Sequence, residues 1–285
     1  MQAAPINPAD LNAIEGKYPG KREVPAVPGF EGSGIVSEVG RNISNGSVGS
    51  LVILPHDIGT WREACAVKAS DLVVVPPEID PVQAAMLKIN PLTAWQLLHG
   101  YVELKSGDWV IQNAANSAAG RAVIQIAHAF GYKTVNVVRR EELIEELRSE
   151  GGDVVLLDDE NLRNAVKDAT GGAAIRLGLN AVGGERALRL MNCLAPGGTL
   201  VSFGAMSLQP LKIPTGLLIF KDLRFRGIWI NKWYDNATPV ERMAAPPVAS
   251  FTALRRFSSS RRTTLPPSDR NSSISSSRRT TFTVL

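Results

Sequence analysis

The chain of 285 residues has only two cysteines, Cys65 and Cys193, and only three histidines. Two cysteines are too few for the disulfide framework of a small secreted domain, and also too few for a structural zinc site. No apolar run approaches the roughly 20 residues that a membrane-spanning helix needs. The first residues also lack the basic and then apolar pattern of a signal peptide. These absences predict a chain without a membrane span, in a reducing compartment.

The net charge of +4 at pH 7 comes from the end of the chain. Residues 246–285 hold seven arginines, no lysine and one acid, Asp269, so this segment carries +6 and residues 1–245 carry −2. A basic groove for nucleic acid is therefore not supported. The same segment is rich in serine, threonine and proline and contains SSSRRTT-like units. This composition predicts a tail that is disordered or read in a shifted frame.

The pattern of strands and helices changes along the chain. Residues 1–88 contain short β-branched runs broken by glycine and proline, which is typical of a β-rich module. Between 89 and 235 we expect strands at 109–114, 133–138, 154–157, 175–181 and 199–204, and helices at 121–130, 141–149, 162–169 and 185–194. Strand–helix–strand crossovers of this length predict an α/β fold with a doubly wound parallel sheet. Residues 236–245 are expected to begin another helix.

A turn of small residues separates an apolar strand from a helix in the stretch WVIQNAANSAAG at 109–120. Small side chains let the backbone approach a pyrophosphate, and the first N–H groups of the helix face the anion. Only Gly120 remains of the usual glycines, so a turn without a ligand is the alternative. Its position at the head of alternating strands and helices favours a dinucleotide site, formed by Asn116, Ser117, Ala118, Ala119 and Gly120.

Two arginines, Arg139 and Arg140, follow the second expected strand, and Arg139 lies 19 positions beyond Gly120. An acidic residue at about this distance would bind the ribose 2′-hydroxyl of NAD. A guanidinium group instead pairs with phosphate through charge-assisted hydrogen bonds. The alternative is two solvated arginines at the start of a helix, where positive charge is unfavourable. The pair therefore predicts NADPH as the cofactor.

Longer motifs resemble a known superfamily. INPADL at 6–11, GKYPGK at 16–21, VPGFEGSGIVSEVG at 27–40 and INPLTAW at 89–95 are similar to the medium-chain dehydrogenase/reductases. GTWR at 59–62, the NAANS turn and residues 227–233 more narrowly resemble the trans-2-enoyl-thioester reductases, which act on enoyl-CoA or enoyl-acyl carrier protein. The similarity covers about residues 2–245. It implies a Rossmann domain at 89–235 and an incomplete GroES-like substrate domain at 1–88, with both ends of the chain truncated or altered.

The resemblance also implies a reaction, in which hydride passes from NADPH to the C2–C3 double bond of the enoyl thioester. Charge then develops on the thioester oxygen as an enolate, so a hydrogen-bond donor must face that oxygen. Tyr18 matches the catalytic tyrosine of the family; a packing role for this loop residue is the alternative. The resemblance adds further cofactor contacts: Asn90, Phe203, Gly204, Ala205, Met206, Ile228, Trp229, Ile230 and Asn231.

Zinc is not expected. Zinc-dependent relatives place a cysteine near residues 7–10 and a histidine before Glu31, and here the residue before Glu31 is Phe30, which cannot bind a metal. The histidines and cysteines show no ligand spacing such as C-x₂-C or H-x₃-H. The chemistry that zinc would supply must therefore come from hydroxyl or backbone N–H groups.

Two alternatives stay open beside the enoyl reductase. One is an NADPH-dependent quinone reductase of the same superfamily, and the other is an inactive truncated product. The expected partners are an acyl thioester of CoA or of acyl carrier protein and, for the complete protein, a second copy paired through the strand near 223–229. Nucleic acid and membrane are not expected as partners. We expect a cytoplasmic location of the bacterial type, with a mitochondrial location as the alternative.

Overall fold

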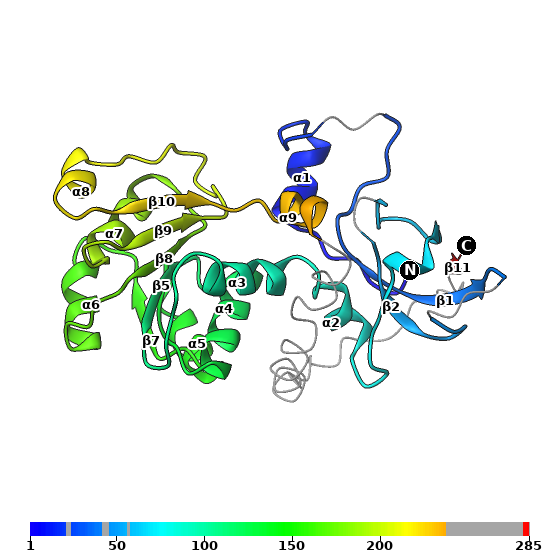
Figure 1. The fold of residues 1–285 in the computed structure, drawn as a ribbon, viewed down its shortest axis with the longest axis horizontal. Coiled ribbons are helices and arrows are strands. Elements are labelled where there is room, and N and C mark those ends of the chain that lie inside the picture. The colour runs from blue at the N-terminus through cyan, green and yellow to red at the C-terminus, as the bar shows by residue number, and fades with distance from the viewer. Residues whose placement is uncertain (21–23, 42–45, 56–57, 238–281, 285) are drawn as a thin grey trace, which may run out of the picture. The chain divides into compact units, whose positions relative to one another are not determined.

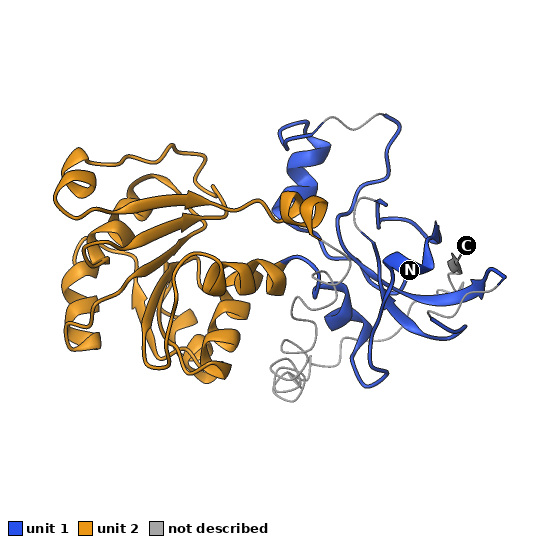
Figure 2. Ribbon diagram, viewed as in Figure 1, with its two compact units in different colours: residues 1–89, 255–285 blue, residues 90–254 orange. Residues whose placement is uncertain are grey.

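The computed structural model describes residues 1–20, 24–41, 46–55, 58–237 and 282–284. The chain divides into two compact units, residues 1–89 with 255–285 and residues 90–254 (Figure 2). Each unit is described below by itself. Within the described ranges, no helix is long and apolar enough to cross a membrane.

The second unit contains a six-stranded sheet in which every pair of neighbouring strands is parallel (Figure 1). The strand order is β10-β9-β8-β5-β6-β7. Because the order runs outward in both directions from the β5–β8 pair, this is the doubly wound arrangement with a switch point between β5 and β8. The strands are β5 (Trp109–Asn113), β6 (Lys133–Val138), β7 (Val154–Leu157), β8 (Leu177–Asn180), β9 (Thr199–Ser202) and β10 (Arg224–Gly227).

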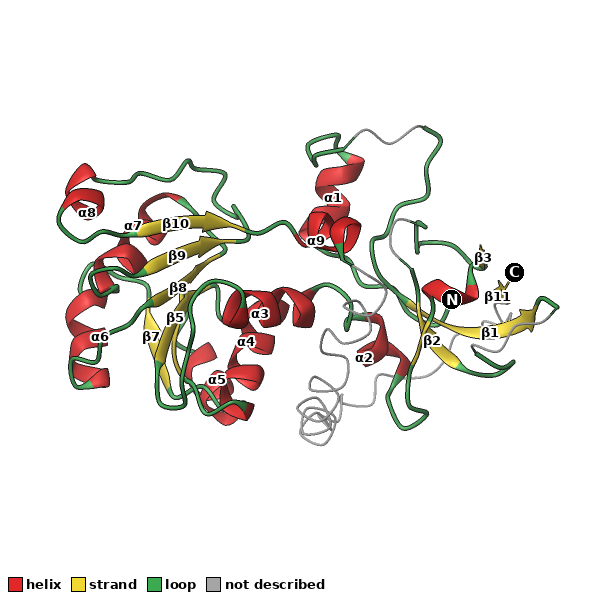
Figure 3. Cartoon of the chain, in the orientation of Figure 1, coloured by secondary structure: helices red, strands yellow, loops and turns green. Residues whose placement is uncertain are grey.

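Helices cover both faces of this sheet (Figure 3). Alternate residues of β5 point to opposite faces, so Val110 packs with α3 and α4 whereas Ile111 packs with α6 and α7. Strands that are buried on both sides are mostly apolar, and the buried polar residues of this sheet, such as Asn136 and Asn180, are hydrogen-bonded. The helices of the unit are α3 (Asn90–His99), α4 (Ala118–Ala129), α5 (Leu143–Ser149), α6 (Leu162–Thr170), α7 (Gly184–Cys193), α8 (Thr215–Ile219) and α9 (Ile230–Asn236).

The first unit is built on a smaller sheet with the order β3-β11-β1-β2-β4. Strand β2 is antiparallel to both β1 and β4. Its core consists of short apolar stretches from several strands, with Val36, Val52 and Leu54 nearly inaccessible to solvent. The elements are α1 (Pro8–Ile14), β1 (Ser33–Val39), β2 (Leu51–Ile53), β3 (Ala66–Val67), β4 (Val73–Val74), α2 (Pro81–Ala85) and β11 (Phe282–Val284).

Most expected elements of the Rossmann unit agree with the structure to within a few residues, and the strands at 133–138 and 154–157 agree at both ends. Helices α1, α2, α3, α8 and α9 were not expected, because two of them begin at proline and all but α3 are short. The helix expected at 236–245 is not found at its start, since α9 ends at Asn236 and the backbone of Ala237 is extended. Residues 238–245 lie outside the described part.

The last strand, β11, falls within the segment that was expected to lack regular structure. It lies between β1 and β3 and is parallel to both. An open strand edge offers unpaired backbone N–H and C=O groups, and the backbone of a second segment with high β-propensity can hydrogen-bond to them. These three residues depart from the expectation for 246–285, and the other residues of that segment lie outside the described part.

Candidate functional site

The carboxyl ends of the parallel strands bring most of the predicted cofactor residues to one edge of the sheet. Residues 116–120 follow β5, Arg139 and Arg140 follow β6, and residues 203–206 follow β9. In open α/β sheets, ligands bind outside this edge at the switch point. The structure therefore brings together three segments that are far apart in the sequence.

The turn between β5 and α4 is shaped for an anion. Ser117 caps α4, and its hydroxyl accepts a hydrogen bond from the Gly120 N–H at 3.1 Å. The N–H groups of Ala118 and Ala119 have no acceptor among the described residues. A side chain at Gly120 would bring a Cβ to 2.5 Å from the Ala115 carbonyl oxygen, so only glycine permits this close turn. Free N–H groups at a helix N-terminus fit a pyrophosphate.

The conformation of the turn also depends on Ala114 and Arg121. Ala114 has a φ of +49°, in the left-handed region that favours glycine. The Arg121 guanidinium donates to the Asn116 carbonyl oxygen at 3.1 Å and to Glu146 at 2.8 Å, and it also pairs with Glu150. These bonds connect the turn to helix α5 and hold its backbone in place.

Both predicted phosphate-binding arginines are exposed just after β6. Arg140 pairs with Glu142, with 3.3 Å between Nε and Oε1. Arg139 has no ion-pair partner in the described part of the chain. An unpaired guanidinium beside the turn fits a 2′-phosphate better than a 2′-hydroxyl.

Three polar side chains at the ends of neighbouring strands form a buried amide network that the sequence analysis missed. Asn113 donates to the Asn180 side-chain oxygen at 2.9 Å, and Asn180 donates to the Ser202 hydroxyl at 3.0 Å. The side-chain oxygens of the two asparagines accept hydrogen bonds from the backbone N–H groups of residues 181–183. The sequence does contain a signal for this network, because β5, β8 and β9 each end in a polar residue.

The other predicted cofactor residues lie outside the turn. Gly204, Ala205 and Met206 are exposed in the loop after β9. Asn90 begins α3, whose residues Ala94, Leu97 and Leu98 pack with the turn helix α4. The last four predicted residues, which are Ile228, Trp229, Ile230 and Asn231, follow β10 and run into α9.

The predicted catalytic residue, Tyr18, belongs to the first unit. It follows α1, its backbone N–H donates to the Asn12 carbonyl oxygen at 3.0 Å, and its half-buried ring packs against Phe30 with 5.2 Å between ring centroids. The phenol can act as a hydrogen-bond donor. Phe30 itself contributes only an apolar ring at this position.

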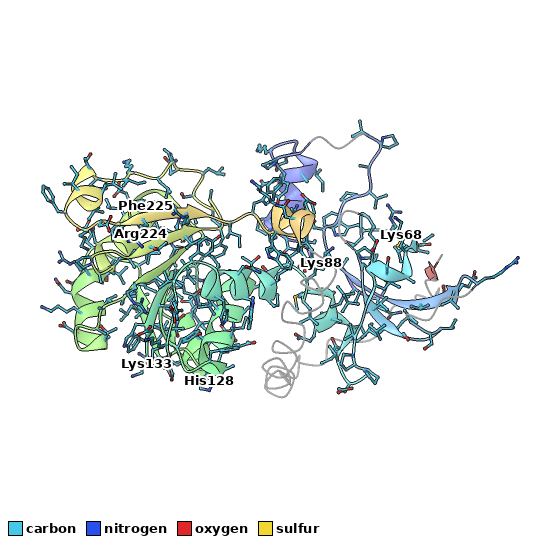
Figure 4. All side chains as sticks on the ribbon, viewed as in Figure 1. Lys68, Lys88, His128, Lys133, Arg224 and Phe225 are labelled. Carbon is cyan, nitrogen blue, oxygen red and sulfur yellow. The ribbon has the colours of Figure 1, made fainter. Side chains whose placement is uncertain are left out.

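A buried polar cluster lies directly behind Phe30. The Asp10 carboxylate accepts from the Phe30 N–H at 2.9 Å, and the Lys88 ammonium donates to the Phe30 carbonyl oxygen at 3.2 Å (Figure 4 labels Lys88). Glu31 accepts from the Asn7 amide and from the Ile89 N–H, both at 2.9 Å. Burial raises the pKa of Glu31 to about 7, although these two hydrogen bonds and the Lys88 charge oppose the change. The cluster holds the backbone of Phe30, the residue whose ring packs against Tyr18.

Metal ligands are not grouped in the part of the chain that the structure describes: no three His, Cys, Asp or Glu side chains converge there. The two cysteines are free thiols, and burial raises the pKa of Cys193 to about 11. The described side-chain donors around Phe30 and Glu31 include the Asn7 amide and the Lys88 ammonium group.

A parallel Rossmann sheet joined to a β-rich unit is the architecture of the medium-chain dehydrogenase/reductases, and comparisons with known proteins agree. The family model described as "Alcohol dehydrogenase GroES-like domain" matches residues 1–77, and the model described as "Zinc-binding dehydrogenase" matches residues 118–245. The mitochondrial enoyl-[acyl-carrier-protein] reductase of Caenorhabditis elegans is 47% identical over 238 residues, which cover 82% of this chain and 68% of that protein. The chain belongs to the enoyl-acyl-carrier-protein reductase family.

Solved structures give the same result for the fold. Etr1p in complex with NADP and crotonyl-CoA superposes with a TM-score of 0.78 at 28% identity, covering 88% of this chain and 77% of that one. Etr1p also occurs in a mitochondrial 2-enoyl thioester reductase heterodimer, Etr1p/Etr2p, from Candida tropicalis. A putative NADPH:quinone reductase from Bacillus thuringiensis gives a TM-score of 0.78 at 27% identity, covering 89% of this chain and 77% of that one.

The comparisons correct the expected location. The expectation of a bacterial-type cytoplasmic protein is wrong, because the curated relatives from nematode, rat and human are mitochondrial enoyl-acyl-carrier-protein reductases. Composition and a low cysteine count indicate a reducing environment, which does not separate these compartments. The chain spans about two thirds of the length of these relatives.

Proposed function

We propose that this protein reduces the C2–C3 double bond of trans-2-enoyl thioesters with NADPH. The observation that carries the proposal is the small-residue turn followed by the unpaired Arg139 at the same sheet edge, in a chain of the enoyl-acyl-carrier-protein reductase family. The turn suits the pyrophosphate, and the guanidinium suits the 2′-phosphate that distinguishes NADPH from NADH. The cofactor, when bound, supplies the hydride.

The chain's own residues supply the remaining chemistry. Once C3 has accepted a hydride, negative charge lies on the thioester oxygen of the enolate, and a proton must then add at C2. We assign the Tyr18 phenol to donate a hydrogen bond to that oxygen and to help deliver the proton to C2. The aromatic contact with Phe30 limits the positions of the phenol ring. The Asp10 and Lys88 bonds to the Phe30 backbone hold that contact in turn.

The substrate is an acyl thioester, carried by CoA or by acyl carrier protein. Support for CoA comes from the Etr1p complex with crotonyl-CoA, and support for the carrier protein comes from the names of the curated relatives. The test measures the oxidation of NADPH by its absorbance, first with crotonyl-CoA and then with the same acyl group on carrier protein. Turnover of neither thioester would refute the function.

A quinone reductase is the second candidate, favoured by the similarity to the Bacillus thuringiensis protein. Quinone reduction needs the same cofactor edge but no donor aimed at a thioester enolate. Incubation with NADPH and a small quinone separates the two functions. Turnover of the quinone without turnover of crotonyl-CoA would favour this candidate.

The protein pairs with a second copy through β10. This strand is an edge of the sheet, with Arg224 and Phe225 on it (Figure 4). Two apolar residues at the end of the preceding helix α8, Ile219 and Phe220, are 66% and 84% exposed. An open edge beside exposed apolar side chains favours association. The heterodimer of the Candida tropicalis reductase supports pairing in the family. Light scattering distinguishes a dimer from a monomer.

A further inference from the structure

We propose that Asn113 and Asn180 are positioning residues that set the nicotinamide half of the cofactor site without acting on the adenosine half. The inference rests on the proposed NADPH-dependent function. It assigns the buried amide network a role in placing the part of the cofactor that reacts.

The two asparagines lie on opposite sides of the switch point of the sheet. Asn113 ends β5 and Asn180 ends β8, and both side chains are almost inaccessible to solvent. The strands β5, β6 and β7 form one mononucleotide-binding half and β8, β9 and β10 form the other. The hydrogen bond of 2.9 Å between the two side chains therefore joins the two halves at the switch point, where a dinucleotide crosses from one half to the other.

The orientation of each amide is fixed by backbone donors. The Asn113 oxygen accepts from the Ala181 N–H at 2.8 Å, and the Asn180 oxygen accepts from the Val182 and Gly183 N–H groups at 3.2 and 3.0 Å. Two side-chain oxygens thus satisfy three consecutive buried N–H groups. Because an unsatisfied buried N–H group is costly, residues 181–183 depend on both asparagines for their conformation.

This buried inner loop supports an exposed outer loop. Met206 and Ser207 donate backbone hydrogen bonds to the carbonyl oxygens of Ala181 and Val182 at 3.0 and 2.9 Å. The Ser207 hydroxyl also donates to the Val182 carbonyl oxygen, at 2.6 Å, which makes a third bond between the two loops. The outer loop carries the proposed cofactor contacts 203–206, so its position above the sheet follows from the two amides beneath it.

The adenosine half has separate supports. Gln112 donates to the Gly120 carbonyl oxygen at 2.9 Å and to the Asn136 side chain at 2.8 Å, and Ser117 caps α4. These bonds lie on the β5–β6 side of the switch point. Removal of the Asn180 amide leaves all of them in place, so the two halves should respond differently.

The test measures two ligands by isothermal titration: NADPH, and adenosine 2′,5′-bisphosphate, which occupies only the adenosine half. For Asn180→Ala we expect NADPH affinity to fall roughly tenfold or more, with adenosine 2′,5′-bisphosphate affinity changed by less than about twofold. Ser207→Ala, which keeps both buried amides, should weaken NADPH binding to a smaller extent and leave the half-ligand unaffected. Asn164→Ala, which removes an exposed amide on α6, is the matched control and should change neither affinity.

An equal loss of both ligands in Asn180→Ala would overturn the inference, because it would indicate general damage. NADPH affinity within twofold of the unsubstituted chain in both variants would also overturn it. If Asn180→Ala does not fold, Ser207→Ala alone decides between these outcomes. An unsubstituted chain that binds NADPH but reduces neither crotonyl-CoA nor the same acyl group on carrier protein would refute the proposed function and leave this inference standing, whereas absence of NADPH binding would overturn both.

Discussion

The buried carboxylate of Glu31 predicts that this protein loses stability as the pH rises. The side chain is 1% exposed, and burial raises its pKa from an ordinary value of 4.5 to about 7. In the unfolded chain the group ionises near its ordinary value. Between pH 4.5 and 7 the folded state therefore holds a proton that the unfolded state has released, and the free energy of unfolding falls with pH.

The size of this effect follows from the displacement of the pKa. One pH unit corresponds to about 1.36 kcal/mol, so the full displacement corresponds to ~3 kcal/mol above pH 7. Below pH 4.5 both states are protonated and Glu31 contributes no pH dependence. The hydrogen bonds from Asn7 and Ile89 and the charge of Lys88 are already included, because they oppose the rise.

Glu31→Gln isolates this contribution. The amide is neutral at every pH and similar in shape, so the variant should lack the decline that Glu31 causes in the original protein. Urea unfolding at pH 5 and at pH 8 gives the difference between the two proteins at each pH. We expect the variant to gain about 2.5 kcal/mol relative to the original between these pH values, because part of the effect is already present at pH 5. Glu38→Gln, at an exposed position, is the matched control and should leave the pH dependence of the free energy of unfolding unchanged.

An unchanged difference between Glu31→Gln and the original protein at the two pH values would refute the reasoning. It would mean that Lys88 and the two hydrogen bonds offset burial completely, and that the carboxylate is ionised throughout. A difference that grows in the opposite direction would mean that the ionised form is the one the fold stabilises.

Three further perturbations test the site and the assembly. Arg139→Ala should reduce the preference for NADPH over NADH about tenfold, measured by titration of both cofactors. Arg140→Ala should reduce this preference by a smaller factor, because Arg140 pairs with Glu142. Equal affinities for the two cofactors in the unsubstituted protein would exclude the 2′-phosphate role. Tyr18→Phe removes one donor and little volume, so turnover with crotonyl-CoA should fall by about 10²–10³ while NADPH affinity is unchanged; near-normal turnover would assign the enolate to other groups. Phe220→Lys should convert the dimer to a monomer in light scattering, with the exposed Lys167→Ala as control, and an unaffected dimer would place the interface elsewhere.

The Rossmann fold could be predicted from the sequence because its signals are local. Runs such as 133–138 are short and rich in valine, and the helices between them are amphipathic, so strand and helix each follow from a few adjacent residues. The short elements could not be predicted in this way. Helices α1 and α2 have seven and five residues, too few for a helical period to emerge, and both begin at proline.

The same distinction separates the two halves of the cofactor site. Residues 116–120 and Arg139 belong to one strand–turn–helix–strand segment, so their spacing along the chain carries the prediction of a phosphate site. Asn113 and Asn180 are 67 positions apart, and each by itself is only a polar residue after an apolar strand. The two side chains can bond to each other only because β8 lies beside β5, and this neighbourhood is a property of the sheet order.

The buried amides of Asn113 and Asn180 therefore support the cofactor site in a way that a local sequence motif does not reveal. The proposed phosphate turn offers backbone N–H groups as any similar turn would, whereas the inner loop 181–183 depends on two side chains that accept its N–H groups. Substitution in the turn should weaken every ligand that carries the adenosine phosphates. Substitution of the asparagines should weaken only ligands that extend across the switch point, because only those ligands reach the loops that the amides support.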